Sequence, residues 1–241
     1  MVSLKSRLER AVKPNTLRSY LAEFISTFLF DFAMMSDTTK DPPALVAVKV
    51  ANAFALSVAV YAATNIYGCH VNPEITFGMA VWGHITVSMD IFYWISQLVG
   101  FVSACLFLKV TTVSQHHVPV HGIPQEMTGF GASILEGVMT FGLIYTVYAA
   151  EKPRRGPLGA IGPLAIEFWF IVGANVLACG PFTGMSMNPA YSFGSALVGG
   201  SFKNHVVYWV ELLIGVALAG ILYDNVVFPI QVPSIADGIG V

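Results

Sequence analysis

Charged residues are scarce in this sequence. Only 12 Lys and Arg and 14 Asp and Glu occur among 241 residues, so charged residues make up 11% of the chain, against about 25% in soluble domains. A soluble surface on a protein of this size would need more charge, because 55% of the residues are hydrophobic. The shortage of charge therefore excludes a soluble globule and indicates that much of the exterior faces lipid.

Several functional signatures are also missing. The formal net charge is −2, and no run of Lys and Arg with interleaved aromatics offers a groove for nucleic acid. The three cysteines form no CxxC motif or metal-ligand cluster, so we interpret them as reduced packing residues, with a pore-lining role for Cys179 as the alternative. No nucleophile and base pair, nucleotide loop or metal constellation is found outside the apolar segments. We expect no nucleic acid partner, cofactor, metal or catalytic residue.

Long hydrophobic runs, in contrast, are abundant. A helix needs about 20 mostly apolar residues to cross the hydrocarbon core of a bilayer, and six runs of this length predict six transmembrane helices. Their approximate bounds are Leu17 to Met35, Ala44 to Tyr67, Ile91 to Val113, Gly129 to Ala150, Leu158 to Cys179 and Val206 to Phe228. The connections are short, so residues 1–241 are predicted to form one all-α membrane domain.

The basic residues predict the orientation of these helices. Short loops rich in Lys and Arg stay on the cytoplasmic side of a membrane. Five basic residues lie before or at the start of the first run, and Lys152, Arg154 and Arg155 lie between the fourth and fifth. An even number of spans places both groups on one side, so both termini are predicted to be cytoplasmic. The loop of His116, His117 and His121 then lies on the other side. These histidines have no acidic or Cys companion at metal-ligand spacing, so we do not expect a metal site there; metal binding or a response to acidity is the alternative.

Two shorter apolar segments, Cys69 to His84 and Gly184 to Gly199, are too short to cross. The first contains Asn72-Pro73-Glu74 and the second Asn188-Pro189-Ala190. Asn followed by Pro is typical of a helix N-cap with Pro at the first helical position, so each segment is predicted to begin a helix of two to three turns.

The two Asn-Pro boxes belong to an internal repeat. Glu23 precedes Asn72 by 49 residues and Glu136 precedes Asn188 by 52, which predicts one repeat over about 17–113 and a second over about 129–228. Three spans per repeat invert the second copy, so the two half-helices enter from opposite faces and their N-termini meet near the midplane. Irregular backbone at that depth requires a polar cavity or burial in protein. We therefore expect a pathway for something small, with Glu23 and Glu136 accepting hydrogen bonds from the two re-entrant loops.

At this level of detail the sequence resembles the major intrinsic proteins, or aquaporins. The stretches that carry the resemblance are HVNPEITFGMAVWGH, GANVLACGPFTGMSMNPAYSFGSALVGGSF and VYWVELLIGVALAG, and their wording is most similar to plant tonoplast intrinsic proteins. The resemblance covers roughly residues 15 to 230 and implies a passive channel for water or small uncharged solutes such as glycerol, urea, ammonia or hydrogen peroxide. It also implies a homo- or hetero-tetramer in the vacuolar membrane of a plant.

The resemblance also implies roles for individual positions. Asn72 and Asn188 match the hydrogen-bond donors at the pore centre, where the two helix N-termini disfavour cations. His70 is expected to anchor the first loop, with gating by pH as the alternative. A second constriction, the selectivity filter, maps onto Asn52, Val176, Met185 and Tyr191.

Several positions depart from the family pattern. The family usually has Gly or Ala at the position of Met185 and Arg at the position of Tyr191. The filter is therefore expected to be more apolar and less selective against charge, or to be blocked. Alternatively, the Tyr191 side chain packs against its neighbours and the pore stays open. Glu74 replaces the Ala of the first box and either faces the pore or turns to a neighbouring helix or loop. Three more acids lie within the predicted spans: Asp31, Glu167 and Glu211. A charged group at a span centre costs about 2.5 to 3.5 kcal/mol. Each of these acids is therefore expected to lie near a helix end, to be protonated or to be paired.

These departures leave three functions to weigh. A passive channel is the leading hypothesis. A secondary transporter is a second class, because inverted repeats with broken helices also form carriers. The third is a non-conducting or regulatory subunit of mixed tetramers, which the bulky filter and the extra acids favour.

Overall fold

The computed structural model of the protein describes residues 6, 9, 11–35, 42–67, 69–112, 118, 120–151 and 163–227. Several residues discussed above therefore lie outside the described part of the chain: His116, His117, Lys152, Arg154 and Arg155. In the described part the regular structure is entirely helical. This result confirms the all-α prediction.

Six long helices occur where six spans are predicted. They are α2 (Pro14–Met35), α3 (Pro42–Tyr67), α5 (Val87–Thr111), α6 (Gly129–Glu151), α7 (Pro163–Thr183) and α9 (Val207–Leu222), which continues into the π-helical turn η2 (Tyr223–Val227). Two short helices, α4 (Pro73–Val81) and α8 (Pro189–Gly199), follow the Asn-Pro boxes. Helix α5 begins four residues earlier than predicted because the Thr86 side chain caps it, accepting a hydrogen bond from the Met89 amide at 3.3 Å.

The long helices differ in apolar character. By length and composition alone, three described helices can cross a membrane: α5, α6, and α9 together with η2. Helices α3 and α7 contain shorter apolar stretches, Lys49–Ala63 and Ile171–Thr183. Helix α2 carries Glu23 and Asp31, and both side chains are buried inside the protein. These two carboxyl groups therefore make internal contacts and do not face lipid.

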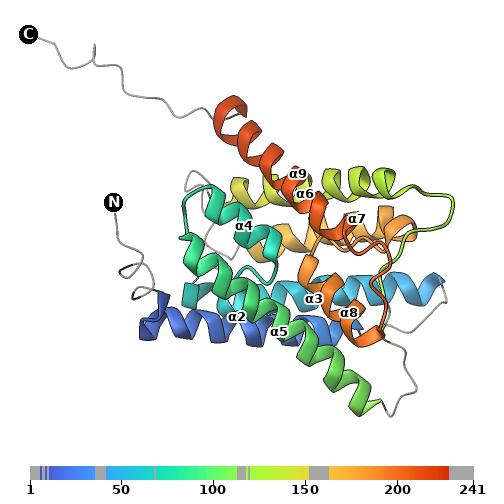
Figure 1. Ribbon diagram of the computed structural model, residues 1–241, viewed down its shortest axis with the longest axis horizontal. Coiled ribbons are helices and arrows are strands. Elements are labelled where there is room, and N and C mark those ends of the chain that lie inside the picture. The colour runs from blue at the N-terminus through green and yellow to red at the C-terminus, as the bar shows by residue number, and fades with distance from the viewer. Residues whose placement is uncertain are drawn as a thin grey trace, which may run out of the picture.

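The helices form two groups of three related by the repeat. In the first group α2 packs against α3 and α5, and in the second α6 packs against α7 and α9. Figure 1 shows the two groups one above the other, with α4 close to α9 and α8 close to α5. Each half-helix thus contacts long helices of both repeats, as an inverted repeat requires.

A glycine brings the helices together at the same place in each group. A Cβ atom at Gly100 of α5 would lie 3.0 Å from the carbonyl oxygen of Phe24 in α2. A Cβ atom at Gly215 of α9 would lie 2.8 Å from the carbonyl oxygen of Gly137 in α6. These glycines are 115 positions apart, close to the 116 that separate the two boxes. Small residues therefore set the close helix contacts of both repeats.

Candidate functional site

The two Asn-Pro boxes begin the half-helices as predicted. Asn72 has extended backbone angles, and its Oδ1 accepts a hydrogen bond from the Glu74 amide at 2.9 Å. Asn188 has the same conformation, and its Oδ1 accepts from the amides of Ala190 at 3.1 Å and Tyr191 at 3.4 Å. Pro73 and Pro189 occupy the first helical turn. The N–H groups of this turn have no acceptor within the helix, so the N–H that proline lacks costs no helical hydrogen bond.

The two half-helix N-termini are bound to each other. Nδ2 of Asn72 donates to the carbonyl oxygen of Met187 at 2.6 Å, and Nδ2 of Asn188 donates to the carbonyl oxygen of Val71 at 2.9 Å. Val71 and Met187 each precede a box and have positive φ angles of 55° and 45°. This conformation is uncommon outside glycine and costs about 1 to 3 kcal/mol per residue. The reciprocal hydrogen bonds stabilise it and hold the two boxes face to face.

Two buried glutamates bind the loops that lead into the boxes. The Glu23 carboxylate accepts hydrogen bonds from the amides of His70 and Val71, the second at 2.9 Å. The Glu136 carboxylate accepts from the amides of Ser186 and Met187, each at 3.3 Å. The same contact thus occurs in both repeats.

The His70 side chain lies in the first of these loops. It is buried, its Nδ1 lies 3.1 Å from the hydroxyl of Thr76, and its ring stacks on Tyr93 with centroids 5.0 Å apart. These contacts join the loop to α4 and α5.

A narrow cavity lies beside the boxes. Its volume is about 30 Å³, room for about two water molecules. Its lining includes both box asparagines, Asn72 and Asn188, and three of the four predicted filter residues, Val176, Met185 and Tyr191. Asn52, the fourth, is buried but is not among the lining residues. The remaining lining residues are Phe30, Met34, Leu56, His70, Val71, Ile75, Leu143, Val172, Ser186 and Met187, so the cavity is mostly apolar.

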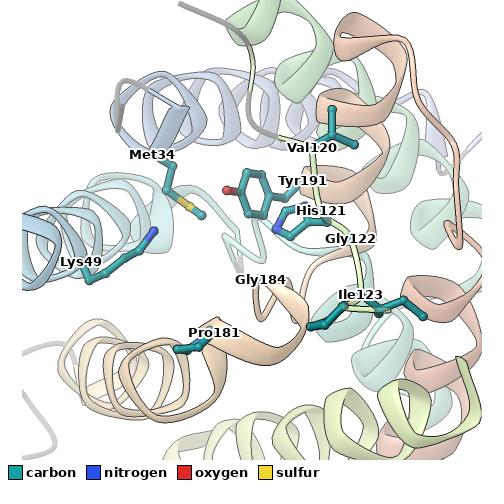
Figure 2. A pocket seen from close by; sticks show the side chains of 11 residues that line it. Met34, Lys49, Val120, His121, Gly122, Ile123, Pro181, Gly184 and Tyr191 are labelled. Atoms are coloured by element: carbon teal, nitrogen blue, oxygen red, sulfur yellow. The ribbon is translucent and has the colours of Figure 1, made fainter. Parts of the chain in front are cut away.

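A wider cavity of about 390 Å³ adjoins the narrow one. Figure 2 shows the side chains of Met34, Lys49 and Tyr191 converging on it from three directions. Met34 and Tyr191 line both cavities and therefore form the boundary between them. Sequence reasoning placed neither Met34 nor Lys49 at this site.

The two unusual filter residues are both buried. Met185 is 1% exposed and has a φ angle of 50°, a conformation that favours the glycine common at this position in the resembling family. Tyr191 is 7% exposed, and its ring lies edge-on to His121 with centroids 4.2 Å apart. The Tyr191 ring lies at the boundary of the two cavities and therefore narrows the passage between them.

His121 is a third residue that sequence reasoning did not place at this site. It lies in the loop before α6 and lines the wide cavity. Burial, with Lys49 and His205 nearby, lowers the pKa of His121 to about 3, so its imidazole is neutral at physiological pH. A Cβ atom at Gly184 would lie 2.7 Å from Cδ2 of His121. Gly184 therefore makes room for the ring, a signal that only the folded structure reveals.

Two of the extra acids, Glu74 and Glu211, lie behind the boxes. Glu74 is fully buried and does not line the narrow cavity; its side chain interacts with Glu211 of α9 and Thr140 of α6. Asp31 of α2 is also fully buried and accepts a hydrogen bond from the Cys105 thiol at 3.4 Å. Glu167 is in α7, but its side chain lies outside the described part.

The comparisons with known proteins agree with this arrangement. The sequence matches the family described as Major intrinsic protein over residues 10–223. It is 50% identical to the probable aquaporin TIP5-1 of Arabidopsis thaliana, with 99% of this chain and 97% of that protein covered. It is 51% identical to aquaporin TIP2-1 of the same plant, with 88% of each covered. The X-ray structure of the aquaglyceroporin from Plasmodium falciparum shares the fold, with a TM-score of 0.70, 19% identity, and 86% of this chain and 97% of that chain covered.

Proposed function

Because the chain belongs to the major intrinsic protein family, whose members are membrane channels and not enzymes, we propose that it is a passive channel for water and small uncharged solutes. Glycerol, urea, ammonia and hydrogen peroxide are the candidate solutes besides water. The observation that carries the proposal is the narrow cavity of about 30 Å³ lined by Asn72 and Asn188, whose half-helices are bound face to face.

The geometry supports a simple mechanism. The N-termini of α4 and α8 each place about half a positive charge at the centre of the pathway, which disfavours cations. Each asparagine NH₂ group donates one N–H to a carbonyl oxygen of the opposite loop, and it retains a second N–H for a passing solute. The apolar walls offer few competing partners, so water passes in single file while it accepts hydrogen bonds from the two asparagines.

The filter differs from the usual pattern in both size and charge. Val176, Met185 and Tyr191 give it apolar and aromatic walls, and no guanidinium stands where Tyr191 lies. The amine of Lys49 points into the wide cavity instead. We propose that Lys49 supplies the positive charge at this mouth, while Met185 and Tyr191 limit the size of the solute.

A non-conducting subunit is the second candidate, and the same two residues favour it. Met185 and Tyr191 are almost completely buried at the narrowest part of the pathway, so they can also act as a plug. In that case the chain would contribute to mixed tetramers without conducting by itself.

Stopped-flow light scattering of proteoliposomes distinguishes the two candidates. The experiment compares empty vesicles, the natural protein and a Met185→Gly/Tyr191→Arg double variant, with water and glycerol gradients. A channel accelerates water flux several-fold over empty vesicles with its natural filter. If only the double variant conducts, the natural filter is a plug and the subunit role replaces the channel role. If neither conducts, the proposed pathway is wrong. A carrier would instead saturate with solute and respond to an ion gradient.

Location and assembly are also proposals. The relatives carry the names of TIP-type aquaporins, which supports residence in the vacuolar membrane. The basic residues before α2 and between α6 and α7 support a multi-pass orientation with both termini in the cytoplasm. The lipid bilayer surrounds the protein, and homo- or hetero-tetramers with related channels are the proposed assembly.

A further inference from the structure

Two fully buried carboxyl groups interact across the interface between α4 and α9. Glu74 is in the first turn of α4, Glu211 is in α9, and both side chains are 0% exposed. The two carboxyl groups lie within hydrogen-bonding reach of each other. Both residues stand where the family pattern has small or apolar side chains, so the interaction is a feature of this chain.

The hydrogen bonds of this pair are incomplete. Oε2 of Glu211 accepts from the Thr140 hydroxyl at 2.7 Å. Oε1 of Glu211 and both carboxyl oxygens of Glu74 have no hydrogen-bond partner, because the nearby Thr140 hydroxyl has a single hydrogen and donates it to Glu211. Three buried oxygens thus lack a donor, although a buried polar group without a hydrogen bond costs about 1 to 3 kcal/mol. These oxygens require a ligand that supplies a donor or a positive charge.

The surroundings of the pair add negative charge. Glu136 of α6 is a third acid, and it interacts electrostatically with both Glu74 and Glu211. The Glu136 carboxyl group accepts hydrogen bonds from two backbone amides. The Tyr208 hydroxyl also faces the group, but it donates to the carbonyl oxygen of Thr183 at 2.9 Å. The N-terminus of α4 favours one negative charge near Glu74. A second negative charge in the pair would be opposed by Glu136 and by burial.

We propose that Glu74 and Glu211 form a proton-binding site, in which the two carboxyl groups share a proton at neutral pH through an O–H···O hydrogen bond. The proton places a hydrogen bond between two of the three unpartnered oxygens, and it removes the repulsion between two adjacent buried carboxylates, which cannot both remain ionised at hydrogen-bonding distance. The hydrogen bond joins α4 to α9 on the side of the half-helix that does not line the narrow cavity. The shared proton therefore fixes the position of the helix that begins at Asn72.

A metal ion fits this site less well than a proton. In the described residues no group of three or more His, Cys, Asp and Glu side chains can hold a metal ion. A proton needs only two facing oxygens. A monovalent cation remains a distinguishable occupant, and the experiment includes an arm for it.

Infrared spectroscopy of the full-length protein in lipid vesicles at pH 7 tests the proposal independently of transport. A protonated carboxylic acid gives a carbonyl stretching band that an ionised carboxylate lacks. We compare the natural protein with Glu74→Gln and Glu211→Gln, and use Glu126→Gln as the matched control because Glu126 is exposed. Both pair variants are expected to alter the same component of the band, whereas the control leaves it unchanged. An unchanged band in both folded pair variants overturns the proposal.

Two further measurements keep the test decisive if a variant does not fold. Natural protein labelled with ¹³C on the glutamate carboxyl groups must show an isotope-shifted carbonyl band at pH 7; its absence means that both carboxyls are ionised and contradicts the shared proton. The unfolding temperature of the natural protein is then compared in potassium, sodium and N-methylglucamine buffers. Equal values agree with a proton, while a higher value in one metal salt that is lost in Glu74→Gln identifies a bound cation and overturns the proposal.

Discussion

Single residues that lie far apart in the sequence define the mouth of the pathway. Val176, Met185 and Tyr191 could be placed at the filter from the family resemblance, by counting from the second box, and all three line the narrow cavity. His121 could not, since it lies 70 positions before Tyr191 and reaches the ring only because Gly184 leaves space for it. Sequence spacing thus predicts local neighbours but not contacts made by a returning loop.

The partly buried His121 predicts how stability depends on pH. Its pKa is about 3 in the folded protein and about 6.5 in an unfolded chain. Below pH 6.5 the unfolded chain binds a proton that the folded protein does not, so stability falls as the pH falls from 6.5 toward 3. The expected contribution of His121 to the loss between pH 7 and pH 5 is about 1 to 2 kcal/mol. It is measured as a fall in unfolding temperature.

The matched variants for this prediction are His121→Asn and His84→Asn. His84 is exposed after α4, so replacing it should leave the pH dependence as it is in the natural protein. His121→Asn should reduce the pH dependence. Equal pH dependence in the natural protein and His121→Asn would contradict the account.

The bounds of the helices follow mostly from local signals. Asn72 and Asn188 begin α4 and α8 because cap and Pro are adjacent in the chain. The end of α7 was predicted too early. The apolar run predicts an end at Cys179, two residues before Pro181. The helix instead continues to Thr183, and the Gly184 amide donates to the Gly180 carbonyl oxygen at 2.8 Å. Contacts in the fold thus override the tendency of proline to end a helix.

The crossed hydrogen bonds predict a large effect for Asn188→Ala. The variant loses the cap on α8 and the donor to the Val71 carbonyl oxygen. The cap alone is worth about 1 to 2 kcal/mol, and the buried carbonyl left without a partner adds a further cost of about 1 to 3 kcal/mol. Asn225→Ala is the control, because exposed Asn225 donates only to the carbonyl oxygen of Ile221 one turn earlier. Similar unfolding temperatures for the two variants would contradict the crossed arrangement.

The close contact of α6 and α9 predicts that Gly215→Ala is destabilising. The added Cβ would lie 2.8 Å from a backbone oxygen and from the Thr140 side chain. Forcing the helices apart is expected to cost about 1 to 3 kcal/mol. Gly142→Ala in α6 is the control, since its Cβ would meet only the Ile171 side chain at 3.7 Å. We expect this control to equal or exceed the natural unfolding temperature; a Gly215→Ala variant as stable as the control would show that the contact is looser than described.

At the scale of the whole molecule, the repeat could be predicted because corresponding positions of the two halves carry the same residue types. Glu23 and Glu136 bind corresponding loops, and Gly100 and Gly215 set corresponding helix contacts. The direction of the Glu74 side chain was not predictable. It depends on how α4 sits against α6 and α9, which the sequence of the box does not encode.

The proposed pathway for water is the cavity between the crossed boxes. Water that dissolves in lipid loses its hydrogen bonds, whereas the asparagines of a pore replace them. The decisive measurement is therefore the temperature dependence of osmotic water flux in proteoliposomes of the natural protein. The account predicts a faster flux than in empty vesicles and a weaker temperature dependence. The same rate and temperature dependence as in empty vesicles, with correctly folded protein in the membrane, would contradict it.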